Sequence, residues 1–350
     1  MREKSLKDIS WNVSEETYRE DPALSYSTLA TYERGGFNCI EHLFDRKDSP
    51  ALTFGSAVDT LITGGQEEFD NKFLVAEFPS LSDKALKIIR ELFTDNHITC
   101  RGFEDIPEEK VLEKISTYEY WNNCKSETKL KKLSDEGVAE YYDLLQLALD
   151  KTLLSSEMYT AVLNSVRALK ESPATEYFFR PDNPFDDSIE RLYQLKFKAT
   201  LHGIDYRCMA DLLLVDHKNK IIYPKDLKTS SHYEWEFYKS FIDWDYQIQA
   251  RLYWRIIRNN LDRDPYFKDF ILSDYEFIVV NKNSLTPLTW EFKSTQRNGL
   301  IIVGKPTSPI ELRDPEVIGQ ELKVYLDTSR TVPVGIKETE PNDIIEWLCK

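Results

Sequence analysis

The sequence predicts an α/β protein in which helices flank a central mixed sheet. Three strand-like segments joined by short turns follow one another in residues 188–230. Segments with apolar residues at intervals near 3.6, typical of helices, come before them. A long aromatic helical segment and two further strand-like segments come after them. Such a succession of strands and helices is typical of a sheet covered by helices.

The first half of the chain is predicted to be mostly helical. Residues 25–44 indicate a helix, a Gly-Gly break and a second helix, with Ser27 as the N-cap. Residues 50–65 indicate another helix, closed by a glycine pair. The segments "SDKALKIIRELF" and "LSSEMYTAVLNSVRALKES" also have helical periodicity. The pattern around 95–135 is irregular, and we expect an insertion there.

The second half is predicted to carry the sheet. A helical segment is expected at 233–260, and the tail from about residue 308 is also expected to be helical. No linker is evident, so the sequence predicts one domain: a helical part with an insertion (1–187), a sheet core (188–295) and a tail (296–350). The predicted strands are residues 188–200, 206–216, 221–230, 275–281 and 287–293.

Composition restricts the classes of function. The chain has 350 residues, 41% of them hydrophobic, and a formal net charge of −15. This charge argues against a protein that coats DNA or a membrane with basic surface, but not against a local nucleic-acid cleft. Five cysteines without metal-ligand spacing indicate reduced thiols and a cytoplasmic protein. We expect neither a signal peptide nor a membrane span.

Two aspartates face each other in the predicted hairpin. If its turn is centred between Lys218 and Asn219, Asp211 lies opposite Asp226. Opposed side chains have Cβ atoms about 5 Å apart, so like charges repel, and burial strengthens the repulsion. Three readings stay open: a proton on one carboxylate, a hard cation such as Mg²⁺ between them, or a shifted register with solvated aspartates.

Lys228 adds a positive charge beside this pair. It lies two residues after Asp226, so both side chains share a face of the strand, with Leu227 on the other. A lysine next to a metal-binding acid can contact the attacking water or the scissile phosphate, although a lone lysine at a strand end is more often solvated. Strict alternation likewise puts Asp211 on one face with Met209, Leu213 and Val215.

The order of these residues resembles the PD-(D/E)XK nuclease superfamily. Asp211 is followed by the D-x-K triplet that ends at Lys228. "GSAVD" at 55–59 resembles the upstream helix motif of RecB-like nucleases, and "QARLY", with Gln249 and Tyr253, resembles their downstream Q-x-x-x-Y helix motif. "YRCMADLLL" and the helix pair "LSYSTLATYERGGFNCIEHLF" resemble the RecE-like branch of phage and prophage exonucleases, the exodeoxyribonuclease VIII type. The likeness covers roughly residues 24–295.

The resemblance implies a restriction-endonuclease-like core that hydrolyses DNA with Mg²⁺ or Mn²⁺. Lys228 would assist the water or phosphate, and Gln249 and Tyr253 would orient the substrate strand or the lysine. Relatives of this branch degrade one strand from a duplex end in phage recombination. The implied partners are duplex DNA ends, a single-strand annealing protein and further copies of the chain. The implied metal ligands are Asp59, Asp211, Asp226 and Leu227.

Three positions depart from the family pattern. The family's helix histidine is Asp59 in this sequence. At the position of the first strand where the family has an acidic residue, this sequence has Gln194. Glu190 lies four residues earlier. Some relatives carry a four-cysteine iron–sulfur cluster, but Cys39 has only Cys349 as a counterpart near the C-terminus, so we expect no cluster.

Rival interpretations stay open. They are a structure-specific endonuclease, a non-catalytic DNA-binding or partner-binding module on the same fold, and an unrelated acidic enzyme. Arg207 would contact either a phosphate or a surface acid. Six lysines of the meander would supply a local basic surface or a solvated sheet edge: Lys196, Lys198, Lys218, Lys220, Lys225 and Lys228. Six aromatic residues would form core or stack on unpaired bases: Tyr233, Trp235, Phe237, Tyr238, Phe241 and Trp244.

Overall fold

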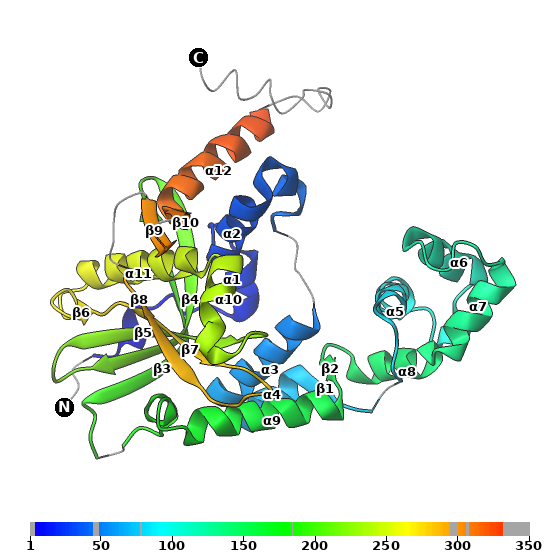
Figure 1. Ribbon diagram of the computed structural model, residues 1–350, viewed down its shortest axis with the longest axis horizontal. Coiled ribbons are helices and arrows are strands. Elements are labelled where there is room, and N and C mark those ends of the chain that lie inside the picture. Colours follow the sequence, from blue (N-terminus) through cyan, green and yellow to red (C-terminus); the bar gives the residue numbers. More distant parts are fainter. Residues whose placement is uncertain are drawn as a thin grey trace. The chain divides into compact units, whose positions relative to one another are not determined.

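A computed structural model describes residues 4–44, 49–77, 79–183, 185–294, 300–305 and 308–331. The chain divides into two compact units (Figure 1). The first consists of Met1–Ser49 together with Ser165–Lys350, and the second of Pro50–Asn164. Helix α9 (Ser156–Glu171) spans the boundary between the two segments. Each unit is described separately below.

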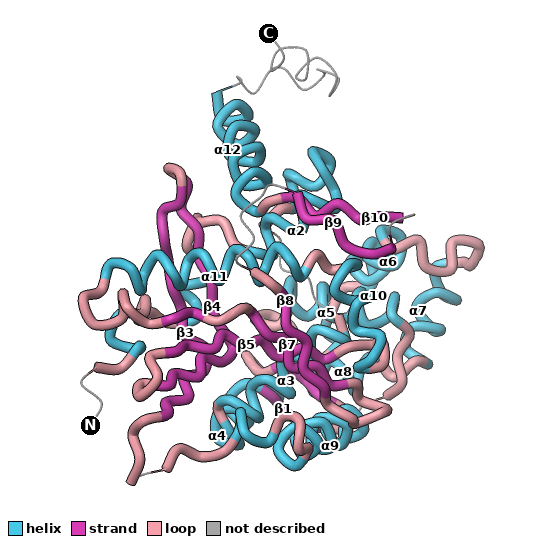
Figure 2. Tube along the Cα trace, turned by 60° about the vertical axis from the view of Figure 1, so that its left-hand side comes forward, coloured by secondary structure: helices cyan, strands magenta, loops and turns pink. Residues whose placement is uncertain are grey.

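The first unit contains a six-stranded mixed sheet, which confirms the predicted fold class (Figure 2). Its strand order is β3-β4-β5-β7-β8, with β6 also paired to β5. The pairs β3–β4, β4–β5 and β7–β8 are antiparallel, whereas β5 is parallel to β6 and β7. The strands are β3 (Ile189–Leu201), β4 (Ile204–Asp216), β5 (Ile221–Thr229), β6 (Ile271–Leu272), β7 (Tyr275–Val280) and β8 (Leu288–Phe292).

Short and long helices surround this sheet. The long aromatic segment that follows β5 forms η5, α10 and α11, and the chain turns between α10 and α11 at Asp245, whose φ is 54°. The helices and 3₁₀ turns of the unit are η1 (Leu6–Ile9), α1 (Glu15–Glu20), α2 (Tyr26–Gly35), η2 (Gly36–His42), η4 (Glu176–Phe179), η5 (Glu234–Glu236), α10 (Phe237–Asp243), α11 (Tyr246–Arg263) and α12 (Pro315–Thr331).

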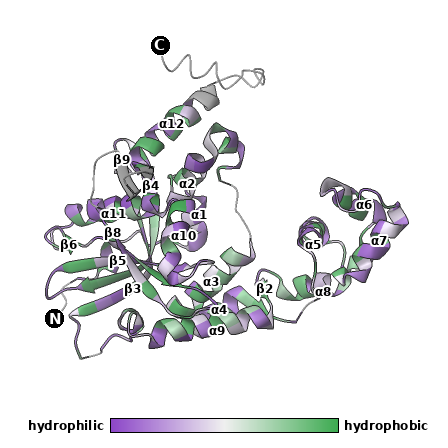
Figure 3. Ribbon diagram, in the orientation of Figure 1, coloured by the Kyte–Doolittle hydropathy of each residue, from purple (hydrophilic) through white to green (hydrophobic). Residues whose placement is uncertain are grey.

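Helix α11 covers one face of the sheet (Figure 1). Its apolar side chains recur three and four residues apart, so one side of the helix is apolar throughout. Ile248, Leu252 and Ile256 of this side are buried in a core with Phe197 of β3 and Phe277 of β7. Figure 3 shows green, hydrophobic stretches along the strands and purple, hydrophilic residues on the visible side of α11. Burial of this apolar surface holds the helix against the strands.

Two expectations about the ends of this unit are corrected. The N-cap of α2 is Ser25, not Ser27, because the Ser25 hydroxyl accepts a hydrogen bond from the Thr28 backbone N–H. The tail does not begin as a helix at about residue 308. Strands β9 (Leu300–Lys305) and β10 (Ser308–Arg313) form an antiparallel pair before α12 begins. The sequences "LIIVGK" and "SPIELR" are rich in residues that favour strands.

The second unit is mainly helical and has its own core. Ile88 and Leu92 of α5 pack with Tyr141 and Tyr142 of α8. Residues 95–135, expected to be irregular, include two helices of ten residues each, α6 and α7. The elements are α3 (Pro50–Thr63), α4 (Gly65–Lys72), β1 (Phe73–Val75), α5 (Asp83–Asn96), η3 (Phe103–Asp105), α6 (Glu108–Thr117), α7 (Ser126–Asp135), α8 (Val138–Ala148) and β2 (Thr152–Leu154).

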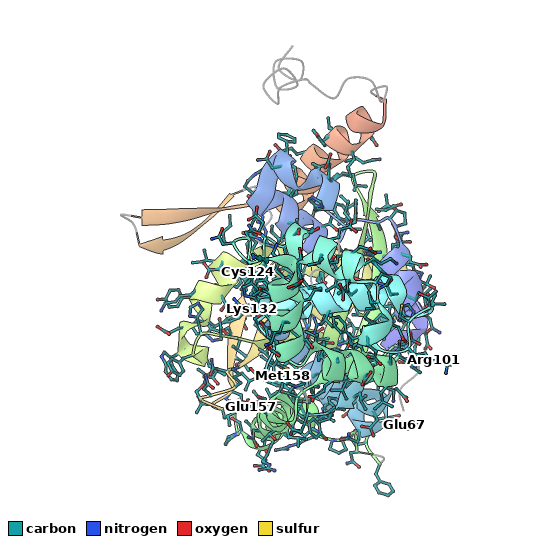
Figure 4. All side chains as sticks on the ribbon, turned by 90° about the vertical axis from the view of Figure 1, so that its right-hand side faces the viewer. Glu67, Arg101, Cys124, Lys132, Glu157 and Met158 are labelled. Carbon is teal, nitrogen blue, oxygen red and sulfur yellow. The ribbon has the colours of Figure 1, made fainter. Side chains whose placement is uncertain are left out.

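The cysteines of the described residues are free thiols. In the second unit, the Cys124 sulfur lies 3.6 Å from Lys132 Nζ (Figure 4). Cys349, which entered the argument about an iron–sulfur cluster, lies outside the described residues. Across the helices of those residues, none combines the length and the apolar character that a membrane crossing requires.

Candidate active site at the end of strand β5

The two aspartates meet where the β4–β5 ladder ends. The ladder runs from Asp216 opposite Ile221 to Leu212 opposite Lys225, which is the predicted register. One further step along each strand brings Asp211 and Asp226 opposite each other. There Asp211 Oδ2 accepts a hydrogen bond of 2.9 Å from the Leu227 backbone N–H. A carboxylate therefore replaces the main-chain acceptor at the point where the two strands separate.

The alternation of β4 breaks at Asp211. Before it, the β4 residues of the core that includes α11 occupy even positions, and after it they occupy odd positions, while Leu212 and Leu214 are buried outside that core. The core residues are Tyr206, Cys208, Ala210, Leu213 and Val215. Gln194, between the paired residues Tyr193 and Leu195 of β3, has a φ of 53°, far from strand geometry. The prediction that Asp211 shares one face with both Met209 and Leu213 is therefore wrong, because a strand irregularity reverses the facing of the residues on its two sides.

Asp226 is buried and both of its oxygens are engaged. Its exposed fraction is 1%. Oδ1 accepts a hydrogen bond of 2.5 Å from Gln249 Nε2, and Oδ2 lies 2.5 Å from Lys228 Nζ. Oδ2 is in this ion pair but accepts no hydrogen bond in the described residues, so the Gln249 hydrogen bond and the charge of Lys228 together offset the desolvation of the carboxylate. The sequence-predicted residues Asp226, Lys228 and Gln249 are thus brought into direct contact.

Lys228 carries a protonated ammonium group at this site. Burial by itself lowers the pKa of the Lys228 amine, but Asp226, Tyr246 and Asp211 together raise it above its usual value. The ammonium also lies 4.7 Å from the centroid of the Tyr246 ring, a cation–π contact. Its side chain remains 17% exposed. Lys228 therefore presents a fixed positive charge that a ligand from solvent can approach.

Two tyrosines complete the buried side of the site. Tyr253 lies one helical turn after Gln249 on α11, and its ring centroid is 6.2 Å from that of Tyr275 on β7. Burial, and then the nearby carboxylates of Asp226 and Asp211, raise the pKa of Tyr275 well above 10. Burial likewise raises the pKa of Tyr253. Both phenols are therefore neutral hydrogen-bond donors at physiological pH.

Tyr275 is a site residue that sequence reasoning missed. Its only signal in the sequence is its position at the start of the strand that follows α11. Within the part of the chain that the structure describes, the Tyr275 hydroxyl and Gln249 Oε1 are buried without a hydrogen-bond partner. Unsatisfied buried polar atoms are uncommon, and they suit a site that receives water or a ligand.

Other candidate residues of the sequence have different surroundings. Glu190 is buried at the start of β3, where it accepts from the Ser5 hydroxyl at 2.6 Å and pairs with His217 at 3.1 Å. It is therefore a structural acid, not part of this site. Asp59 lies half-buried on α3 of the second unit. Its role as a metal ligand stays a prediction.

Arg207 is buried, and its described hydrogen bonds go to backbone carbonyls. Its guanidinium donates to the backbone carbonyls of Tyr18, Arg19 and Asp21, and it lies 5.0 Å from the Tyr18 ring centroid. An arginine presents several donors in a fixed plane, which suits a cluster of carbonyls at a helix end. Arg207 thus holds the end of α1 against β4.

The lysines of the meander do not form a continuous basic surface. Lys196 donates to the Val13 carbonyl, and Lys198 pairs with Asp21 at 2.7 Å. Lys225 is buried and pairs with Glu276 on β7. Lys218 and Lys220 are exposed in the β4–β5 turn. Any affinity of this face for nucleic acid therefore needs contacts other than a row of surface cations.

The aromatic segment after β5 divides into two groups. Phe237 is buried in the core, and Phe241 packs against it. The other four side chains are exposed by about half: Tyr233, Trp235, Tyr238 and Trp244. The expectation that such a stripe is core holds for the first group and fails for the second, because η5 and α10 turn only one side toward the sheet.

The donor set at this site fits a hard divalent cation. The Asp211 and Asp226 carboxylates lie on adjacent strands, and the buried Gln249 Oε1 is an oxygen without a partner in the described structure. Leu227 directs its N–H toward β4, and its carbonyl lies on the same edge of an extended strand. Mg²⁺ is commonly held by one or two carboxylates, waters and substrate phosphates. Within the described residues of the first unit, no third acidic, histidine or cysteine side chain joins them.

Comparisons with known proteins give little further guidance. No protein-family model matches the chain, and no curated protein matches it. A crystal structure of a protein from Eubacterium rectale named "Putative exonuclease" is similar, with a TM-score of 0.39 and 14% sequence identity. The similarity covers 94% of this chain and 88% of that one. The contacts of the site itself therefore support the proposal that follows.

Proposed function

We propose that this protein is a metal-dependent nuclease that hydrolyses DNA phosphodiester bonds. The observation that carries the proposal is the contact of Lys228 and Gln249 with the two oxygens of Asp226, next to Asp211 at the end of the β4–β5 ladder. A lone catalytic acid pair would not need a permanently charged lysine. A fixed positive charge stabilises the negative charge that develops on a phosphodiester in the transition state.

The residues have separate roles in this proposal. Asp211, Asp226 and the Leu227 carbonyl would hold the cation. The chemistry that Mg²⁺ or Mn²⁺ supplies when bound is activation of water and stabilisation of charge on the phosphate. Lys228 would place its ammonium against the attacking water or a phosphate oxygen. Gln249 would fix the orientation of Asp226, and Tyr253 would donate a hydrogen bond to the substrate strand.

We further propose that hydrolysis starts at duplex ends. This mode rests on the resemblance of "YRCMADLLL" and the helix pair "LSYSTLATYERGGFNCIEHLF" to RecE-like exonucleases. The partners in this proposal are DNA ends, a single-strand annealing protein and further copies of this chain, and the setting is phage-type recombination in the cytoplasm. A structure-specific endonuclease would use the same residues.

The test is digestion of end-labelled linear duplex DNA by the purified full-length chain. Degradation is expected with Mg²⁺ or Mn²⁺ and none with EDTA. Asp226→Asn keeps the shape of the side chain and should abolish cleavage in every metal. If the wild-type protein binds DNA but cuts nothing with any divalent cation, the non-catalytic binding module replaces the nuclease.

A further inference from the structure

We propose that Tyr233 and Trp235 form a platform on which an unpaired base of the DNA strand stacks, close to the cleavage site. The two rings are parallel within 9°, and their centroids are 4.6 Å apart. They are 47% and 54% exposed. The inference rests on the proposed function for its choice of ligand, and its test below separates the two.

A buried carboxylate holds the platform rigidly. Glu234, between the two rings in sequence, is fully buried. Its carboxylate accepts hydrogen bonds from the Asn281 N–H at 3.0 Å, the Ser284 hydroxyl at 2.6 Å and the Thr286 N–H at 3.0 Å. Because Glu234 points inward, its two neighbours project outward. Rings that are already ordered lose little entropy when a flat ligand stacks on them.

The platform is tied at both ends to the candidate active site. The chain reaches Tyr233 only five residues after Lys228, a span of at most about 18 Å when extended. The Asn281 side chain donates to the carbonyls of Ser230 and His232 and fixes this short connection. At the other end, α10 leads to Tyr246, whose ring contacts the Lys228 ammonium. This upper limit corresponds to at most about five steps of 3.4 Å along a DNA strand.

The exposed side chains have the chemistry to stack on a base. Between residues 230 and 270, all of which the structure describes, the exposed large hydrophobic side chains are aromatic, and the aliphatic Ile271 follows at 63% exposure. Tyrosine and tryptophan are also enriched in protein interfaces, so the position beside the candidate active site is what favours a DNA base. Aromatic faces stack on any nucleobase without reading its sequence.

The charge of the chain leads to the same ligand. The meander lysines are largely paired within the chain, and the net charge is −15. Binding that relies on phosphate contacts would be weak here and would fall steeply with salt. Stacking does not depend on charge. The platform therefore supplies affinity that this acidic protein otherwise lacks.

The experiment measures binding of a fluorescein-labelled duplex with a short single-stranded extension, in EDTA, by fluorescence anisotropy. Trp235→Ala should weaken binding about tenfold, since stacking contributes about 1–3 kcal/mol per base. Replacing the extension by abasic residues should weaken wild-type binding by a similar factor. The abasic extension should not weaken the binding of Trp235→Ala any further, because that variant has already lost the stacking contact. Trp235→Phe should restore most of the affinity.

Phe185→Ala is the matched control, since Phe185 is an exposed aromatic residue outside the platform. It should bind like the wild type. Equal binding by Trp235→Ala, or an equal loss on normal and abasic extensions, overturns the platform. If wild-type protein cuts DNA while either result holds, the proposed function stands without the platform. Base-dependent binding without cleavage in any metal leaves the platform standing and removes the nuclease.

Discussion

Gln249 on α11 donates a 2.5 Å hydrogen bond to the carboxylate of Asp226 on β5. The helix that covers the sheet therefore also orients an acid of the site. Both side chains are buried, at 4% and 1% exposure, so solvent does not weaken the contact. The other Asp226 oxygen contacts Lys228. A helix and a strand thus hold one carboxylate from two directions.

This contact predicts a specific effect of Gln249→Ala. The substitution should lower kcat about 10- to 100-fold, because a hydrogen bond to a charged group contributes about 1.5–3 kcal/mol. KM for DNA should change less, since Gln249 acts through Asp226. Steady-state kinetics on linear duplex measure both values.

Gln247→Ala is the control for this variant. Gln247 is also buried on α11, but it donates to the Arg313 carbonyl, away from Asp226. Its loss should reduce the unfolding temperature and leave kcat within a factor of a few. Similar kcat values for Gln249→Ala and Gln247→Ala would assign Gln249 a purely structural role.

Lys228→Ala should abolish cleavage without weakening metal binding. The ammonium now neutralises Asp226 Oδ2, so its removal leaves an uncompensated carboxylate that attracts a cation at least as strongly. Asp226→Ala should lose both properties. Mn²⁺ titration followed by electron paramagnetic resonance measures binding independently of activity. A parallel loss of Mn²⁺ affinity in both variants would contradict the separate roles.

The raised pKa of Lys228 predicts a flat alkaline profile. Burial opposes the charged form, but Asp226, Tyr246 and Asp211 hold the pKa above the usual value. The stabilising ion pair is therefore fully present below the pKa of an unfolded lysine, about 10.4. It is lost only as the pH rises through the higher folded value. A plot of kcat against pH from 7 to 10 should therefore show no decline caused by Lys228. A decline in the wild type that is absent from Lys228→Arg would show that Lys228 titrates in this range.

The mode of attack predicts a difference between DNA forms. If hydrolysis starts at ends, covalently closed circles should survive under conditions that consume linear duplex of the same sequence. Agarose gels of a plasmid before and after linearisation measure this directly. Rapid nicking of the closed circle would assign the protein to the endonucleases.

Asp314 should be important for stability rather than for chemistry. Its carboxylate pairs with Arg251 at 2.7 Å and Arg255 at 2.6 Å, and the Arg251 side chain has no exposed surface. Asp314→Ala leaves a buried guanidinium without its counter-ion, which costs about 3–5 kcal/mol. The unfolding temperature should fall by several degrees in calorimetry. Asp327→Ala, which removes an exposed helical ion pair, should change it very little.

Much of the site could be predicted from local pattern. The alternation of β5 placed Asp226 and Lys228 on one face, and the turn "HKNK" fixed the register that brings Asp211 beside Asp226. The i, i+4 spacing of Gln249 and Tyr253 placed both on one side of a helix. These features depend on residues close in sequence, whose geometry follows from strand and helix periodicity.

Other features depended on contacts between distant segments. Asp211 and Met209 lie on different faces of the sheet, because the alternation of side chains along β4 is interrupted opposite Gln194. No periodicity in the sequence marks that position. Arg207 and the meander lysines have partners in α1 and β7, which only folding brings near.

The sequence by itself thus determined the mixed sheet, the D-x-K strand and the helix that faces it, because hydrophobic periodicity and turn residues act over a few positions. Only the tertiary structure decided which charges are paired within the chain and which rings remain exposed. In the sequence, Tyr233 and Trp235 are aromatic residues like Phe237, which is buried, and nothing local distinguishes them. Burial of Glu234 among the backbone groups of residues 281–286, about fifty positions away, decided their exposure.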